Sequence, residues 1–171
     1  MPYVLARAAL ACGISLLTAV LSQGVFYVLL QTRWDPLSVP FRWFWCTFLL
    51  SAAGAFLGLA IGFLVETPID GSGVMPFLFL LQFQTSGYAP PQNQMHDYTK
   101  PMRFPNLLHW ANKIYLTLNF HGTSNARADQ VLLGLDIRTG QVGGSFQGLA
   151  ACFVACFFIA AAAAHRRQCQ Q

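Results

Sequence analysis

Apolar residues are gathered into four long runs along the chain, with polar segments between them. The runs cover residues 3–31, 40–65, 73–89 and 145–164. A helix needs about 20 mostly apolar residues to cross the roughly 30 Å of hydrocarbon in a bilayer, and each run reaches or approaches this length. The pattern therefore predicts an all-α fold, a polytopic membrane helical bundle with four transmembrane helices.

The first run has a second interpretation, a secretory signal peptide with Arg7 in its charged region. Its apolar residues continue through VFYVLL to residue 30. That length exceeds the apolar core of a signal peptide. We therefore expect an uncleaved membrane helix.

A long polar segment, residues 90–144, separates the third and fourth runs. Within it, PNLLHWANKIYLTLNF (105–120) places apolar residues at spacings of one, three and four, which predicts an amphipathic helix begun by Pro105. We expect this helix to lie in the interface or to re-enter the membrane edge, because it is too polar to cross. The polar residues responsible are Asn106, His109, Asn112, Lys113 and Asn119. A further short helical piece is expected at DQVLLGLD (129–136).

Composition supports an integral membrane protein. Charged residues make up 9% of the chain and the mean hydropathy is +0.47, whereas soluble domains carry about 25% charged residues. Basic residues near both ends, Arg7 and the His165-Arg166-Arg167 tail, predict that both termini are cytoplasmic. That orientation requires an even number of crossings and puts residues 90–144 outside. Trp34, Trp43 and Trp45 then fall at the expected outer interface.

The ten Lys and Arg residues are scattered, without a basic run interleaved with aromatics. A nucleic-acid partner is therefore not expected. No ionisable residue lies deep in a predicted span, which argues against an ion-coupled transporter.

Common catalytic motifs are absent from the sequence. The sequence contains no phosphate-binding loop, no G-x-S-x-G, no H-E-x-x-H and no pair of intramembrane carboxylates. We therefore expect no enzyme activity and no catalytic residues in this chain.

Metal ligation is likewise not expected, although two groups of residues leave it open. His96, His109 and His121 lie at spacings of 13 and 12 in the outer segment, where solvated loop residues are the favoured interpretation. Cys152 and Cys156 share one helix face, where packing is favoured. The five cysteines show no disulfide framework.

Gly54, Gly58 and Gly62 recur every four residues in the second run. Such a stripe leaves one helix face nearly bare, so that another helix can approach closely. Ordinary packing within the bundle is favoured, and a specific dimer interface stays open.

The third run ends in FLFLLQFQTSGYAPP (77–91), with polar and small residues in its last turns. A helix that emerges into water becomes polar for that reason alone. The same residues would also suit a helix that borders a polar cavity, and both interpretations stay open from these residues.

The order of these features resembles the membrane domain of the G subfamily of ABC transporters, from its third to its sixth transmembrane helix. The stretches that carry the resemblance are YVLARAALACGISLLTAVLSQGVFYVLL, FLLSAAGAFLGLAIGFLVE, TSGYAPP, PNLLHWANKIYLTLNF and LLGLD. It covers almost all of the 171 residues. It implies a partial exporter membrane domain, in which two copies face each other and pass lipids, sterols or amphipathic compounds through a central cavity.

The resemblance also implies roles for single residues. The family's short fifth helix lines the cavity, and the matching face here holds Pro76, Leu80 and Phe83. Ser86, Gly87 and Tyr88 would match the turn beneath the family's apolar plug. The piece around Trp110 would match the re-entrant helix, and the glycine stripe would pack the family's fourth helix.

Several departures from the family qualify this picture. The sequence lacks an ATP-binding domain, the family's first two helices and the coupling segment before the third, so Met1 is interpreted as the start of a fragment, a truncated gene model or one piece of a split gene. No cofactor is then expected in this chain, and ATP and Mg would act only through a missing domain or a partner. The expected partners are an ATP-binding half-transporter or a second copy, membrane lipid and an amphipathic substrate.

The plug region departs too, because Tyr88 and Ala89 stand where bulky aliphatic residues are common, and the outer loop lacks the cysteines of many members. A non-transporting structural or accessory subunit with four spans is the alternative function.

Overall fold

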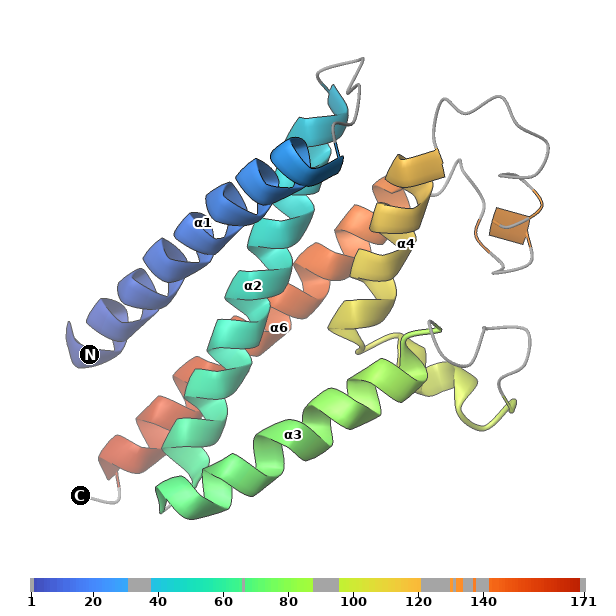
Figure 1. Ribbon diagram of the computed structural model, residues 1–171. Helices are drawn as coiled ribbons and strands as arrows, with labels where there is room; N and C mark the ends of the chain where they lie inside the picture. Colours follow the sequence, from blue (N-terminus) through green and yellow to red (C-terminus); the bar gives the residue numbers. More distant parts are fainter. Residues whose placement is uncertain are drawn as a thin grey trace. The chain divides into compact units, whose positions relative to one another are not determined.

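The computed structural model describes residues 2–30, 38–65, 67–87, 96–120, 130, 132–133, 137 and 142–169. The elements are α1 (Pro2–Leu30), α2 (Ser38–Leu64), α3 (Pro68–Thr85), the 3-10 helix η2 (Lys100–Arg103), α4 (Leu107–Phe120) and α6 (Val142–Cys169), shown in Figure 1. These described segments contain helices and no strand. The expected all-α membrane bundle is confirmed.

Three helices of the described part are long and apolar enough to cross a membrane: Leu5–Val25, Val39–Leu64 and Val142–Arg167. They correspond to the first, second and fourth predicted spans. The third corresponds to α3, which has 18 residues, Asp70 in its first turn and Pro76 inside it. Because polar residues and glycines occupy its first two turns, α3 is less apolar than the other three, and its crossing stays a prediction.

The start of α3 was predicted five residues too late. Thr67 precedes the helix, and its hydroxyl accepts a hydrogen bond from the backbone N–H of Asp70 at 3.3 Å. The same hydroxyl donates to the Asp70 carboxylate at 2.6 Å. This reciprocal arrangement resembles a capping box, with Pro68 in the first helical position, where its missing N–H costs nothing. This cap starts the helix at Pro68, ahead of the apolar run.

The chain forms two compact units, and each is described by itself. The first comprises Met1–Leu78 with Phe153–Gln171, and the second Phe79–Cys152. In the first unit, α1 and α2 run antiparallel side by side (Figure 1). Phe56 of α2 packs edge to face against Phe153 and Phe157 of α6, with ring centroids 5.6 and 5.4 Å apart.

The outer surface of this unit is apolar, with large exposed side chains such as Leu17 and Phe158. A membrane span needs no polar outer face, because lipid replaces water around it. Of the tryptophans expected at an interface, Trp45 is exposed and Trp43 is buried in the unit. Trp34 lies outside the described residues.

In the second unit, the predicted amphipathic helix is confirmed as α4. Its buried residues are Leu107, His109, Ala111, Ile114, Thr117 and Leu118. The predicted start at Pro105 is wrong, because α4 begins at Leu107 and Asn106 caps it. Of the helical piece expected at 129–136, residues 130, 132 and 133 are described as helical, with Leu132 buried. The rest of that piece lies outside the described residues.

Candidate functional site

The last turn of α3 satisfies its own backbone acceptors. The hydroxyl of Thr85 donates to the carbonyl oxygen of Leu81 at 2.9 Å, and that of Ser86 to the carbonyl oxygen of Phe83 at 2.7 Å. Gly87 follows with φ of 85°, the left-handed conformation that commonly ends helices and that glycine adopts without strain. The sequence Q-T-S-G therefore ends the helix.

Asn106 joins this helix end to α4. Its Nδ2 donates to the carbonyl oxygen of Gln82 at 2.6 Å and to the hydroxyl of Thr85 at 2.7 Å. Its Oδ1 accepts from the backbone N–H groups of Leu108 and His109 at 2.8 and 3.2 Å. The side chain is 2% exposed. One buried amide thus caps α4 and holds the end of α3.

His109 makes the second connection. Its Nδ1 lies 3.1 Å from the carbonyl oxygen of Ser86, and the side chain is 1% exposed. Because a carbonyl only accepts, Nδ1 carries the hydrogen of this bond. The pKa of His109 is lowered to about 4, chiefly by burial and also by the nearby charges of Lys113 and Arg103, against the raising effect of the Ser86 carbonyl. The ring is therefore neutral at pH 7.

We call this arrangement of Gln82, Thr85, Ser86, Gly87, Asn106 and His109 the α3–α4 corner. It contradicts the interpretation of His109 as a solvated loop residue. His96 is exposed, and His121 lies outside the described residues. Among the described residues no three His, Cys, Asp or Glu side chains are close enough to hold a metal ion together.

The residues predicted to line a path divide into two groups. Pro76, Leu80 and Phe83 lie along α3, and Leu80 and Phe83 are 53% and 37% exposed. Ser86 and Gly87 are buried in the corner, and Tyr88 lies outside the described residues. The structure thus places the first group on an open helix face and fixes the second group against α4. Their role in transport stays a prediction.

Comparison with family models gives one match that decides the broad class. Residues 1–120 match the model described as ABC-2 type transporter, which is more than half of the 171 residues. The chain belongs to the ABC-2 type transporter family. A search of curated proteins gave no match.

The match runs from α1 through α4, so the α3–α4 corner lies inside the family's region. The chain is an integral membrane protein that forms part of an ABC transporter permease, and such membrane domains generally pair with an ATP-binding partner. The broader part of the resemblance is confirmed. Its assignment to the G subfamily remains an expectation.

Three residues of the chain were not singled out from the sequence as site or contact residues: Asn106, Trp110 and Gly148. Trp110 donates from Nε1 to the carbonyl oxygen of Phe104 at 2.9 Å and packs against His109 at 5.1 Å between ring centroids. A Cβ at Gly148 of α6 would lie 2.5 Å from Cδ2 of Trp110. The asparagine before the periodic run was the one available signal, since asparagine is a preferred N-cap.

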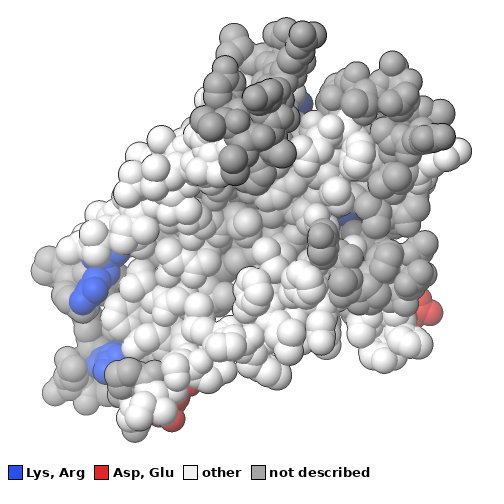
Figure 2. Space-filling view, viewed as in Figure 1, with Lys and Arg blue, Asp and Glu red and all other residues white. Residues whose placement is uncertain are grey.

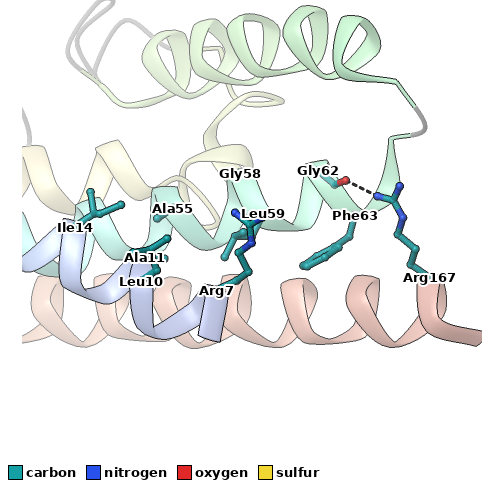
Figure 3. A pocket seen from close by; sticks show the side chains of 10 residues that line it. All are labelled: Arg7, Leu10, Ala11, Ile14, Ala55, Gly58, Leu59, Gly62, Phe63 and Arg167. Atoms are coloured by element: carbon teal, nitrogen blue, oxygen red, sulfur yellow. Dashed lines mark hydrogen bonds between the residues drawn. The ribbon is translucent and has the colours of Figure 1, made fainter. Parts of the chain in front are cut away.

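The glycine stripe of this ABC-2 membrane domain (Gly54, Gly58 and Gly62) has open space beside it in the described part of the chain. A Cβ at Gly54 or Gly62 would meet no described atom within 4 Å, and one at Gly58 would meet only Cε of Met75, at 3.8 Å. Gly58 and Gly62 instead line a pocket of about 520 Å³ in the first unit (Figure 3). Close approach by another helix stays a prediction.

Proposed function

We propose that this chain forms part of the translocation path of a G-type ABC exporter for lipids, sterols or other amphipathic compounds. In this proposal the apolar face of α3 that holds Pro76, Leu80 and Phe83 borders the path, and Ser86, Gly87 and Tyr88 stand at its end. ATP hydrolysis, with its Mg, belongs to an ATP-binding partner or domain. This chain itself contributes no catalytic residue.

The observation that carries the proposal is an exposed apolar face on a helix whose end is anchored. Leu80 and Phe83 present large apolar side chains, while Asn106 and His109 hold the following turn through buried hydrogen bonds. A face held in this way can contact an amphipathic compound at a constant position, which favours a binding role over a loose lipid-facing surface. Family membership supplies the transport context.

The test compares two identical substitutions on α3, made in the complex with the ATP-binding partner that co-purifies. Phe83→Ala removes a ring from the proposed face. Phe77→Ala removes a more exposed ring, about 120° from Phe83 around the helix. Both complexes are reconstituted in liposomes, and transport of a fluorescent phospholipid and ATP hydrolysis are measured.

We expect Phe83→Ala to reduce transport about tenfold, since loss of a partly buried ring contact of roughly 1.4 kcal/mol has this effect. Phe77→Ala is expected to change transport less than about twofold. Equal effects of the two variants, or an effect on complex assembly alone, would contradict the path and favour a structural or accessory subunit.

A further inference from the structure

The pocket of the first unit has apolar walls along most of its length. Leu10, Ala11 and Ile14 of α1 face Ala55, Leu59 and Phe63 of α2 across it. The glycines at 58 and 62 open the wall of α2 between these side chains, because they carry no Cβ to fill the space. The pocket of about 520 Å³ is therefore suited to a hydrocarbon chain.

Basic side chains from two helices line the same pocket. Arg7 of α1 and Arg167 of α6 both line it, and both are exposed. Figure 3 shows Ile14 and Ala55 at one end, Arg7 further along and Arg167 beside Gly62 at the other end. Among the described residues that line the pocket, none carries a negative charge.

A hydrogen bond to Gly62 of the glycine stripe positions Arg167. Its Nη1 donates to the carbonyl oxygen of Gly62 at 2.9 Å. A guanidinium carries five N–H donors in a planar fork, so this one bond positions the group and leaves donors for an anion. The bare surface at Gly62 allows an arginine from another helix to reach the α2 backbone.

The position along the helices agrees with a membrane interface. Arg7 and Arg167 lie near the ends of the candidate spans Leu5–Val25 and Val142–Arg167. Figure 2 shows basic side chains at the end of this unit where Figure 1 places both termini. From Arg7 to Ile14 the helix rises about 10 Å, within the roughly 15 Å of one leaflet's hydrocarbon.

We propose that this pocket binds an anionic phospholipid, with its phosphate at Arg7 and Arg167 and an acyl chain along the walls between α1 and α2. Two guanidinium groups that line an apolar pocket, one part-way along it and one at its end, match the charge and the apolar chain of such a lipid. The pocket lining shares no residue with the α3 face of the proposed path, and the inference does not rest on the transport proposal.

The test uses the full chain, purified in detergent and freed of lipid. Dioleoylphosphatidylglycerol and dioleoylphosphatidylcholine have the same acyl chains and differ in headgroup charge, and each is titrated while bound lipid is counted by native mass spectrometry. Glycerol 3-phosphate is added as a competitor, to distinguish a lipid site from a site for soluble phosphate. Circular dichroism establishes that each variant retains its helices.

Arg167→Gln and Arg7→Gln are each expected to weaken phosphatidylglycerol binding roughly fivefold, the usual contribution of one basic residue near an anionic lipid. Arg166→Gln, next to Arg167 but outside the pocket lining, is the control and should leave binding unchanged. Arg7→Lys retains the charge and should retain most of the binding. Gly58→Leu fills the pocket and should weaken both lipids, whereas Gly54→Leu, outside the lining, should weaken neither.

Three results would overturn the assignment. Equal binding of the two lipids by the unsubstituted chain would show a site for any amphiphile. An equal loss in Arg166→Gln and Arg167→Gln would show general attraction to positive charge. Displacement of phosphatidylglycerol by glycerol 3-phosphate would show a site for soluble phosphate.

Discussion

Asn106 uses both ends of its amide in the α3–α4 corner. The amide nitrogen donates to Gln82 and Thr85 of α3, and the amide oxygen accepts from the first N–H groups of α4. Removal of a buried partner leaves the other groups without hydrogen bonds, which costs more than the bonds themselves contribute. A residue with this many buried bonds is therefore a sensitive position.

We expect Asn106→Leu to lower the free energy of unfolding by roughly 2–4 kcal/mol, because it keeps the volume and removes the cap and the bridge. Asn119→Leu, an exposed position in the last turn of the same helix, is the control, with an expected change within about 0.5 kcal/mol. Thermal unfolding of the detergent-solubilised protein measures both. A similar melting temperature for the two variants would show that the corner does not limit stability.

Gly148 is a second sensitive residue, because the ring of Trp110 occupies the place of its missing side chain. Gly148→Ala puts a methyl group 2.5 Å from Cδ2 of Trp110, and overpacking of this kind costs about 1–3 kcal/mol. Gly144→Ala on the same helix meets no atom within 4 Å and should stabilise by up to about 1 kcal/mol through helix propensity.

The same thermal assay distinguishes these two outcomes. Trp110→Leu in the Gly148→Ala background is expected to recover part of the loss, since the obstructing ring is gone. If Gly148→Ala stabilises as much as Gly144→Ala, the close contact of Trp110 with α6 is wrong.

At the scale of elements, α3 and α4 are joined by polar bonds in place of an apolar interface alone. His109 takes part as a neutral ring, with a pKa lowered by burial from 6.5 to about 4. The unfolded chain therefore binds a proton at higher pH than the folded chain. Stability from this group is fully present above about pH 6.5, falls as the pH drops toward 4, and is constant below that.

We expect the protein to lose up to about 3 kcal/mol of stability between pH 6.5 and pH 4 through His109, as the fall of its pKa from 6.5 to about 4 implies. His109→Gln does not titrate, so the difference in melting temperature between the two proteins should shrink as the pH falls over this range. A difference that is constant with pH, or that grows as the pH falls, would contradict a neutral buried ring.

At the scale of the whole molecule, the number of crossings depends on α3. Three described helices qualify as spans by length and composition, which alone would put the two ends of the chain on opposite sides. A crossing by α3 makes the number even and agrees with the basic residues near both ends.

Labelling of cysteines in intact cells tests this topology. In a chain with Cys12, Cys46, Cys152 and Cys156 replaced by alanine, the exposed Cys169 should react with a membrane-impermeant maleimide only after permeabilisation. With Cys169 also replaced, Asp97→Cys, whose native side chain is 94% exposed, should react in intact cells. The reversed pattern, with Cys169 reacting in intact cells and the cysteine at position 97 only after permeabilisation, would show that α3 does not cross, because α6 separates the two sites in either topology.

Local sequence determined much of this protein. The lengths of the apolar runs predicted the long helices, and the spacing from residue 105 to 120 predicted the amphipathic α4, because both properties depend on residues near one another in the chain. The order of the quoted stretches also led to the ABC transporter class, which the family match confirmed.

The tertiary structure decided which distant groups meet. Asn106 and His109 bond to residues more than twenty positions earlier, and Trp110 fills the space at Gly148, because the fold brings α4 against the end of α3 and against α6. The glycine stripe illustrates the difference between what sequence spacing predicts and what the tertiary structure decides. Its spacing predicts a bare helix face, but only the positions of α1 and α6 leave that face open as a pocket with two arginines. Hydropathy depends on each residue's neighbours in sequence, whereas a pocket depends on what other helices leave unfilled.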